Sequence, residues 1–379
     1  MDGERAQTAA TAPRDRPAWR KVARRVVPPL FSVAIVVAVF WYFLPQFTSI
    51  SAVWDSIRSM TWLQVLTLLL LALWNLGTYL IVNVSTMPGL TYPQAAVATE
   101  SSTAISNTVP GGGALGIGIN YAMFSSWGFS RSRTTVSLLV SGVFNNFVKL
   151  ALPVLALALL ALQGSPSGGR LAAGLIGLAA LAGAVAVFAL LLSSQEGAAK
   201  LGRVAGRIAS ALVGIFRRPP VHGWDKATVK FRYRTISLLR ARWIWITLAT
   251  LVSHVSLYVV LLVSLRFAGV SEAQAGWVEV LAAFAFARLL TALPFTPGGL
   301  GVIELALITS LSAAGGNRAD VAAGVLIFRA LTFVLPIPLV AIAYVFWRRN
   351  RSWRRPPGGA PRTDLVAEWV EPDPAPAPA

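Results

Sequence analysis

The stretch ALPFTPGGLGVIELA, residues 292–306, determines how the rest of the chain can be arranged. Its centre, Pro297–Gly301 (PGGLG), separates two apolar arms, Trp277–Leu293 and Leu300–Ala314. At about 1.5 Å per residue the arms span roughly 22–25 Å, less than a hydrocarbon core of about 30 Å. The segment therefore predicts a re-entrant hairpin with its tip near mid-membrane. A broken backbone persists at that depth only where protein buries it or a polar cavity wets it, which indicates a transport or binding site.

The same device occurs once earlier in the chain. Pro110–Gly113 joins the arm Gln94–Val109 to the arm Ala114–Trp127. After each hairpin the order of features also repeats, because Asn146–Pro153 and Arg329–Pro336 have the same separation. A weak repeat that keeps its order predicts two copies of one unit, each made of a helix, a broken hairpin and a helix.

The composition is that of a membrane protein. Hydrophobic residues make up 55% of the 379 and charged residues 13%, with a mean hydropathy of +0.64. A soluble domain carries about a quarter charged residues. The net charge of +18 lies in loops and tails between apolar runs, where membrane topology explains it better than nucleic-acid binding. The chain has no cysteine, which excludes disulfides, thiol catalysis and cysteine-ligated metals.

The apolar runs define the expected topology. They are 30–47, 62–84, 134–162, 171–192, 243–267 and 321–346. The expected regions are a basic cytoplasmic tail 1–29, a first half 30–192 with hairpin 94–127, a basic amphipathic linker 193–242, a second half 243–346 with hairpin 277–314, and a disordered tail 347–379. If the hairpins do not cross, every basic segment falls on one side, so both termini are expected in the cytoplasm.

These observations predict a fold class. It is an all-α polytopic membrane protein of the cell membrane, with about six transmembrane helices plus two re-entrant broken-helix hairpins. The first hairpin enters from the cytoplasm and the second from outside, so the two copies form inverted repeats. That architecture is common among alternating-access carriers.

The hairpin tips are candidate anion sites. At Gly112, Gly113, Gly298 and Gly299 a helical arm begins near mid-membrane, with free backbone N–H groups and the positive end of its dipole. Such an end suits a phosphate. The glycines also have a simpler explanation, because glycine makes tight turns at little cost.

Charged residues inside the apolar stretches are further candidates. They are Glu100, Lys149, Arg288, Glu304 and Arg329, with Asn146 and His254 as polar neighbours. A charge at a helix centre costs about 2.5–3.5 kcal/mol even on lenient scales, so these side chains are expected to face one another or a cavity. Several arrangements stay open at this point.

The alternatives concern pairing. Glu304 either complements its helix dipole or takes part in substrate binding. Arg288 either pairs with Glu304 on the opposite arm of its hairpin or binds substrate, and Glu100 could pair with Arg288 across the pseudo-symmetric interface. Lys149 either extends toward the interface or acts inside the membrane.

No catalytic constellation is present in the sequence. The two histidines, His222 and His254, lie on different elements, and the motifs HExxH, GxSxG and GxxxxGK[ST] are absent. We therefore expect no enzymatic activity, no cofactor and no metal.

The pattern resembles a known family. The segment LLTALPFTPGGLGVIELALITSLSAAGG at 289–316, AAGVLIFRALTFVLPIPLV at 322–340 and the looser ESSTAISNTVPGGGALG at 100–116 look like the lysylphosphatidylglycerol synthase transmembrane region, also described as flippase-like integral membrane proteins. In bifunctional members this region moves aminoacylated phosphatidylglycerol between leaflets, after a cytosolic transferase domain has made it. This chain ends soon after its last span, so we expect no transferase and leave the aminoacylated substrate open.

We therefore interpret the chain as a carrier that moves a phospholipid or aminoacyl-phospholipid between leaflets. Its expected substrate-binding residues are Arg288, Arg329, Lys149, Glu304, Glu100, Asn146, Gly298, Gly299, Gly112 and Gly113. The cations and tips would bind phosphate, and the carboxylates would pair with the cations or accept an ammonium group. The expected partners are anionic or aminoacylated membrane phospholipids and no nucleic acid, with a homo-oligomer left open. The alternatives are a polyprenyl-phosphate carrier, a small-solute or ion carrier on the same scaffold, a lipid-modifying enzyme, and an adaptor acting through the basic linker.

Overall fold

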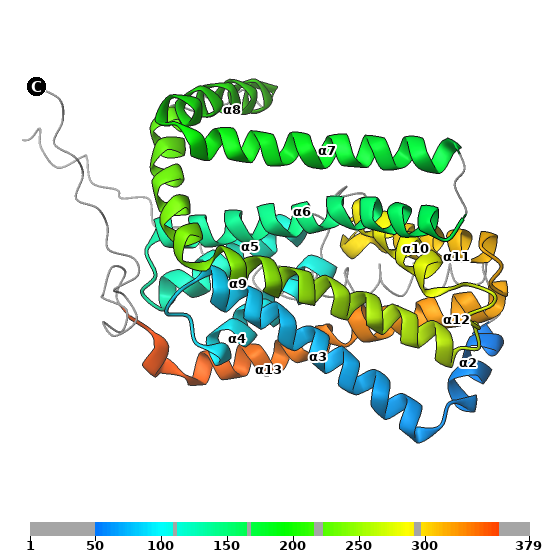
Figure 1. Ribbon diagram of the computed structural model, residues 1–379. Helices are drawn as coiled ribbons and strands as arrows, with labels where there is room; N and C mark the ends of the chain where they lie inside the picture. Colours follow the sequence, from blue (N-terminus) through cyan, green and yellow to red (C-terminus); the bar gives the residue numbers. More distant parts are fainter. Residues whose placement is uncertain (1–49, 109–111, 165–167, 216–222, 292–296, 356–379) are drawn as a thin grey trace, which may run out of the picture.

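The computed structural model describes residues 50–108, 112–164, 168–215, 223–291 and 297–355. These residues form helices and no strand. The long helices run side by side along one common direction (Figure 1). The expected first span, 30–47, and most of the expected C-terminal tail lie outside the described residues.

The α-helices are α2 (Ile50–Ser59), α3 (Trp62–Thr86), α4 (Tyr92–Thr108), α5 (Gly112–Ser126), α6 (Arg131–Leu162), α7 (Gly168–Ser193), α8 (Gln195–Ile215), α9 (Trp224–Phe267), α10 (Trp277–Leu290), α11 (Val302–Ala313), α12 (Arg318–Arg329) and α13 (Pro336–Arg349). A 3₁₀ turn, η1 (Pro297–Gly299), precedes α11, and a π turn, η2 (Ala330–Val334), separates α12 from α13.

The described part of the chain contains five helical segments long and apolar enough to cross a membrane. They are Trp62–Thr86, Arg131–Leu162, Gly174–Ser193, Trp224–Phe267 and Arg318–Arg349. Four of them contain an expected span in full, and the third begins at Gly174 where the expected span begins at residue 171. Large apolar side chains face outward along them, as a lipid-facing surface requires. The chain is an all-α polytopic membrane protein.

Two pairs of short helices form hairpins inside this bundle. Helices α4 and α5 pack together toward the end of the bundle where α8 and α9 meet, and α10 and α11 pack together toward the opposite end (Figure 1). Their ranges match the expected hairpins. Close approach of α4 and α5 requires glycine at Gly112, because an added Cβ would lie 2.3 Å from the backbone oxygen of Ile105. The core of the bundle is a buried apolar cluster shared by α9, α10, α11 and α12.

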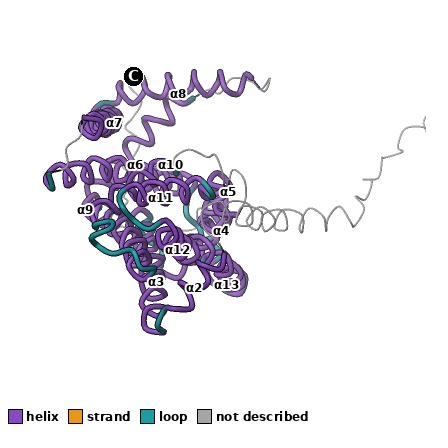
Figure 2. The backbone as a smooth tube through the Cα atoms, turned by 90° about the vertical axis from the view of Figure 1, so that its right-hand side faces the viewer, coloured by secondary structure: helices purple, strands orange, loops and turns teal. Residues whose placement is uncertain are grey.

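The structure corrects the expected linker. Only its first part, α8, is a separate amphipathic helix, and residues 224–242 belong to α9, a single helix of 44 residues. The sequence between Trp224 and Phe267 contains neither glycine nor proline, so nothing ends the helix there. Helix α8 lies at the edge of the bundle (Figure 2) and packs against α9, where a Cβ added at Gly206 would lie 3.2 Å from Cβ of Trp224. At about 66 Å, α9 is longer than a bilayer core, so its basic first turns project beyond the membrane.

The last span is also less regular than expected. It was predicted as one helix over 321–346, but the π turn η2 interrupts it. The backbone N–H of Leu335 donates to the carbonyl of Ala330 at 2.9 Å, which is a π-type bond. Pro336 follows and has no N–H to donate, so the regular ladder cannot continue through it.

The two ends of α9 allow a test of orientation, because the chain has no native cysteine. We expect Ala273→Cys, in the loop after α9, to react with a membrane-impermeant maleimide in intact cells. Ala227→Cys, beside the basic first turns, should react only after permeabilisation, because basic segments stay in the cytoplasm. The cysteine-free parent is the control. Labelling of Ala227→Cys in intact cells would reverse the predicted orientation.

Candidate functional site

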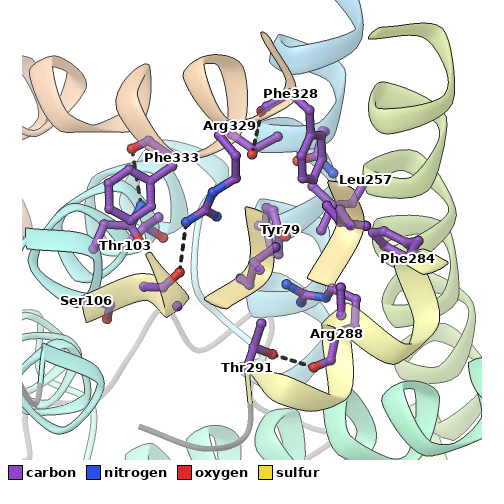
Figure 3. A pocket seen from close by; sticks show the side chains of 18 of the residues that line it. Tyr79, Thr103, Ser106, Leu257, Phe284, Arg288, Thr291, Phe328, Arg329 and Phe333 are labelled. Atoms are coloured by element: carbon purple, nitrogen blue, oxygen red, sulfur yellow. Dashed lines mark hydrogen bonds between the residues drawn. The ribbon is translucent and has the colours of Figure 1, made fainter. Parts of the chain in front are cut away.

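A cavity of about 370 Å³ lies where the tips of the two hairpins meet (Figure 3). Its walls come from α3, α4, α5, α6, α9, α10, α11, α12 and the turns η1 and η2. The depth of the cavity follows from Lys149, which lies 18 residues after Arg131 and 13 before Leu162 on α6. At the helical rise these separations are about 27 and 20 Å, so the cavity lies near the middle of the bundle.

Three cationic side chains line this cavity, and no carboxylate does so among the described lining residues. The cations are Lys149 from α6, Arg288 from α10 and Arg329 from α12. Figure 3 shows Arg288 and Arg329 pointing into the cavity from different helices. The sequence analysis predicted all three, and the fold brings them to one place.

Arg329 is held by several contacts. Its Nε donates to Oε1 of Glu304 at 2.6 Å and its Nη2 donates to the carbonyl of Gly298 at 3.1 Å. Its guanidinium also lies 4.6 Å from the ring centroid of Phe333. Arg329 is 6% exposed and Glu304 8%. The charge of Arg329 is therefore largely compensated inside the protein.

This ion pair decides against one of the two alternatives for Arg288, its pairing with Glu304. Both Arg288 and Glu304 belong to one hairpin, so their nearness in sequence suggested a pair. In the fold, α12 brings Arg329 against the first turn of α11, where Glu304 also faces the positive end of that helix. Glu304 does not line the cavity. It acts as the support of Arg329.

Arg288 and Lys149 lack the side-chain contacts that compensate the charge of Arg329. Neither side chain forms an ion pair or hydrogen bond with another described residue, and the buried Nε of Arg288 has no hydrogen-bond partner. Uncompensated charges inside a membrane protein are costly and are usually functional. The cavity thus presents two free positive charges, which makes it suited to an anion.

The hairpin tips meet beside these charges. Gly298 has a φ of +56°, and an added Cβ there would lie 2.3 Å from Cε2 of Phe333 and 3.2 Å from Oδ1 of Asn107. Asn107, from the end of α4, donates to the carbonyl of Phe333 at 3.3 Å. The first tip, the second tip and the π turn therefore touch at one point. The predicted tip residues Gly112, Gly113, Gly298 and Gly299 all line the cavity.

Besides Glu304, two further predicted residues do not reach the cavity. Asn146 is exposed on α6, and Glu100 is partly buried on α4 away from the lining. Glu100 forms no ion pair within the described residues, so the suggested pairing with Arg288 is not present, and its Oε2 has no hydrogen-bond partner. His254 is buried and its Nδ1 lies 3.0 Å from the carbonyl of Thr250, a packing role that also leaves it out of the lining.

Neutral polar residues complete the lining, and the sequence analysis did not assign them to the site. They include Asn75, Tyr79, Thr103, Ser106, Asn107 and Thr332. Their spacing in the sequence indicates that they share helix faces. Asn75 and Tyr79 are four residues apart in an apolar span, and Thr103, Ser106 and Asn107 follow at helical spacing, so each set lies on one face. Asn75 also ties α3 to α9 by donating to the carbonyl of Ser253 and the hydroxyl of Ser256 at 3.3 Å each.

Comparison with known proteins identifies the family. The model of the lysylphosphatidylglycerol synthase transmembrane region matches residues 30–339, which include both hairpins and every cavity-lining residue. The chain belongs to this family. No curated protein matches the sequence. In this member of the lysylphosphatidylglycerol synthase transmembrane family, no group of three His, Asp or Glu side chains could hold a metal within the described residues.

The tip geometry predicts which glycine cannot be replaced. Gly298→Ala combines a left-handed backbone with a clash against the buried ring of Phe333, so it should destabilise the protein by about 1–3 kcal/mol. Gly118→Ala is the matched control, because an added Cβ at Gly118 meets no atom within 4 Å. Denaturant unfolding of the purified protein in micelles measures both. Equal free energies of unfolding for the two variants would contradict the close packing of Gly298 against Phe333.

The contrast between the cations predicts opposite effects on stability. Glu304→Gln leaves Arg329 buried without its counter-charge and should lower the free energy of unfolding by about 3–5 kcal/mol. Arg288→Gln removes a charge that has no ion-pair partner in the described part of the chain, and it should leave that free energy unchanged or raise it. The same unfolding measurement serves for both variants. A comparable loss for Arg288→Gln would show that a counter-charge compensates Arg288 within the folded protein.

Proposed function

We propose that this chain is a carrier that moves the headgroup of a phospholipid between the leaflets of the cell membrane. The observation that carries the proposal is the pair of free cations, Lys149 and Arg288, in a cavity midway along the membrane-spanning helices. A phosphate group loses its hydration when it enters hydrocarbon, and this loss makes unassisted exchange slow. The two cations replace part of that hydration at the depth where the loss is greatest.

The size of the cavity favours a headgroup over a whole lipid. Ligand pockets typically measure about 300–1,000 Å³, and the 370 Å³ here is at the lower end. Acyl chains do not need to enter, because the outer surface of the bundle is apolar and can remain in contact with lipid. The protein would therefore enclose the polar part of the substrate only.

The two hairpins supply a route to alternate access. In this proposal they are re-entrant, belong to inverted repeats and enter from opposite faces, with the first on the side of the basic α8 and α9 termini. Separating Asn107 from the carbonyl of Phe333 would open the contact between the first tip and the π turn η2. The cavity lowers the barrier for the headgroup and supplies no direction, so net transport needs a gradient or a sink. We propose a carrier and not an enzyme.

Leaflet exchange in liposomes tests the proposal. The purified chain is reconstituted with an acyl-labelled phosphatidylglycerol, and an impermeant reductant bleaches the outer leaflet. Empty liposomes should plateau near half loss, and active ones well beyond it. The double variant Arg288→Gln/Lys149→Gln removes both free charges and should return to the empty plateau. Arg348→Gln, an exposed cation at the end of α13, is the matched control and should behave as wild type.

The outcome also separates the rivals. If wild-type protein plateaus with the empty liposomes for anionic, zwitterionic and aminoacylated lipids and for polyprenyl phosphate, with or without an ion gradient, the lipid-carrier proposal fails. A small anion carrier on the same scaffold would then take its place, since the cavity could enclose a free anion.

A further inference from the structure

The charge balance of the cavity carries an inference about the headgroup. It rests on the proposed function, because it names the substrate class of the same site. We infer that the cavity selects a lipid phosphate monoester, a headgroup with two negative charges, over a phosphodiester, and that it excludes headgroups bearing an ammonium group.

The lining of the cavity carries an excess of positive charge. Three cations line the cavity and Glu304 compensates one of them, Arg329, so 3 − 1 leaves two. A phosphodiester such as phosphatidylglycerol carries one negative charge and leaves one buried cation without a counter-charge. A phosphate monoester has a second ionisation near pH 6 and therefore carries close to two negative charges at pH 7. Only the monoester matches both free cations.

The lining also presents hydrogen-bond donors for a phosphate. A monoester presents three terminal oxygens, each a strong acceptor. Lys149 has three N–H donors, and Arg288 has a planar guanidinium whose Nε is unpartnered. The hydroxyls of Tyr79 and Thr103 line the same cavity, and neither forms a hydrogen bond with the described residues. The lining thus offers donors for three oxygens without breaking any bond that holds Arg329.

The described lining is unfavourable for ammonium groups. A carboxylate beside the amine would compensate the charge of an aminoacyl headgroup, and none of the described lining residues is acidic. Glu304 is not among the lining residues, and its Oε1 accepts a hydrogen bond from Nε of Arg329. A lysyl ester would place two ammonium groups close to Arg288 and Lys149, where like charges repel in a low-dielectric site. The lipid that names the family is therefore a poor fit to this cavity.

Two kinds of lipid carry the required chemistry, a diacylglycerol phosphate and a polyprenyl phosphate. They differ only in the tails, which stay outside the cavity. The test therefore includes both. Purified full-length protein is incubated with equimolar phosphatidic acid, polyprenyl phosphate, phosphatidylglycerol and lysyl-phosphatidylglycerol, and the retained lipids are quantified by native mass spectrometry.

We expect at least one monoester to be retained about tenfold over phosphatidylglycerol, since one additional charged contact distinguishes them, and lysyl-phosphatidylglycerol to be retained least. The monoester retained more strongly identifies the tail. Arg288→Gln leaves one free cation and should bring the monoester preference down to about parity, because the site then matches one charge. Arg348→Gln, outside the cavity, should keep the wild-type ratio.

The lipid-retention and leaflet-exchange measurements distinguish a wrong headgroup preference from a wrong carrier function. Equal retention of monoesters and phosphatidylglycerol, or a preference for the lysyl lipid, overturns the inference even if leaflet exchange is observed. A wild-type ratio that persists in Arg288→Gln overturns it as well. Retention of monoesters without exchange of any lipid in liposomes supports the inference about the site and overturns the proposed carrier.

Discussion

The constraint on which the rest of the structure depends is the placement of two partly buried cations that form no ion pair with the described residues. Lys149 and Arg288 are held in the middle of the bundle, where an isolated charge is expensive. The protein tolerates this cost because the surrounding helices are tightly packed, with Phe284 one turn before Arg288 fully buried in the core. A site of this kind stores instability that a bound anion would relieve.

The third cation shows what the other two lack. Arg329 has a carboxylate, a carbonyl and an aromatic ring as partners, and these contacts connect α11, η1 and η2. The turn that provides the carbonyl exists only because Gly298 can adopt a positive φ beside Phe333. The glycines therefore have a structural role. They bring the tips close enough for the free cations to share one cavity.

Much of the fold was predictable because span length and composition are physical requirements of the membrane. The two pairs of short helices were also predictable, because glycine-rich turns separate short apolar arms in the sequence. The continuous α9 was missed because a basic segment suggested a linker, although no residue in it breaks a helix. The sequence left open which cation pairs with Glu304, because the packing of α12 against α11 decides that contact in space. Asn75 and Tyr79 were undervalued as site residues because neutral polar residues are common packing groups in spans.

Family membership and cavity chemistry answer different questions. The family model covers the scaffold, including the hairpins that every cavity of this design needs. The charge of the lining is set by single side chains, so relatives with the same scaffold can accept different headgroups. In this chain Glu304 pairs with Arg329, and within the described residues neither Arg288 nor Lys149 forms an ion pair with a carboxylate. An empty cavity is thus the least favourable state of the proposed cycle. Exchange of one anionic headgroup for another follows naturally from that imbalance, whereas one-way transport would require a further source of free energy.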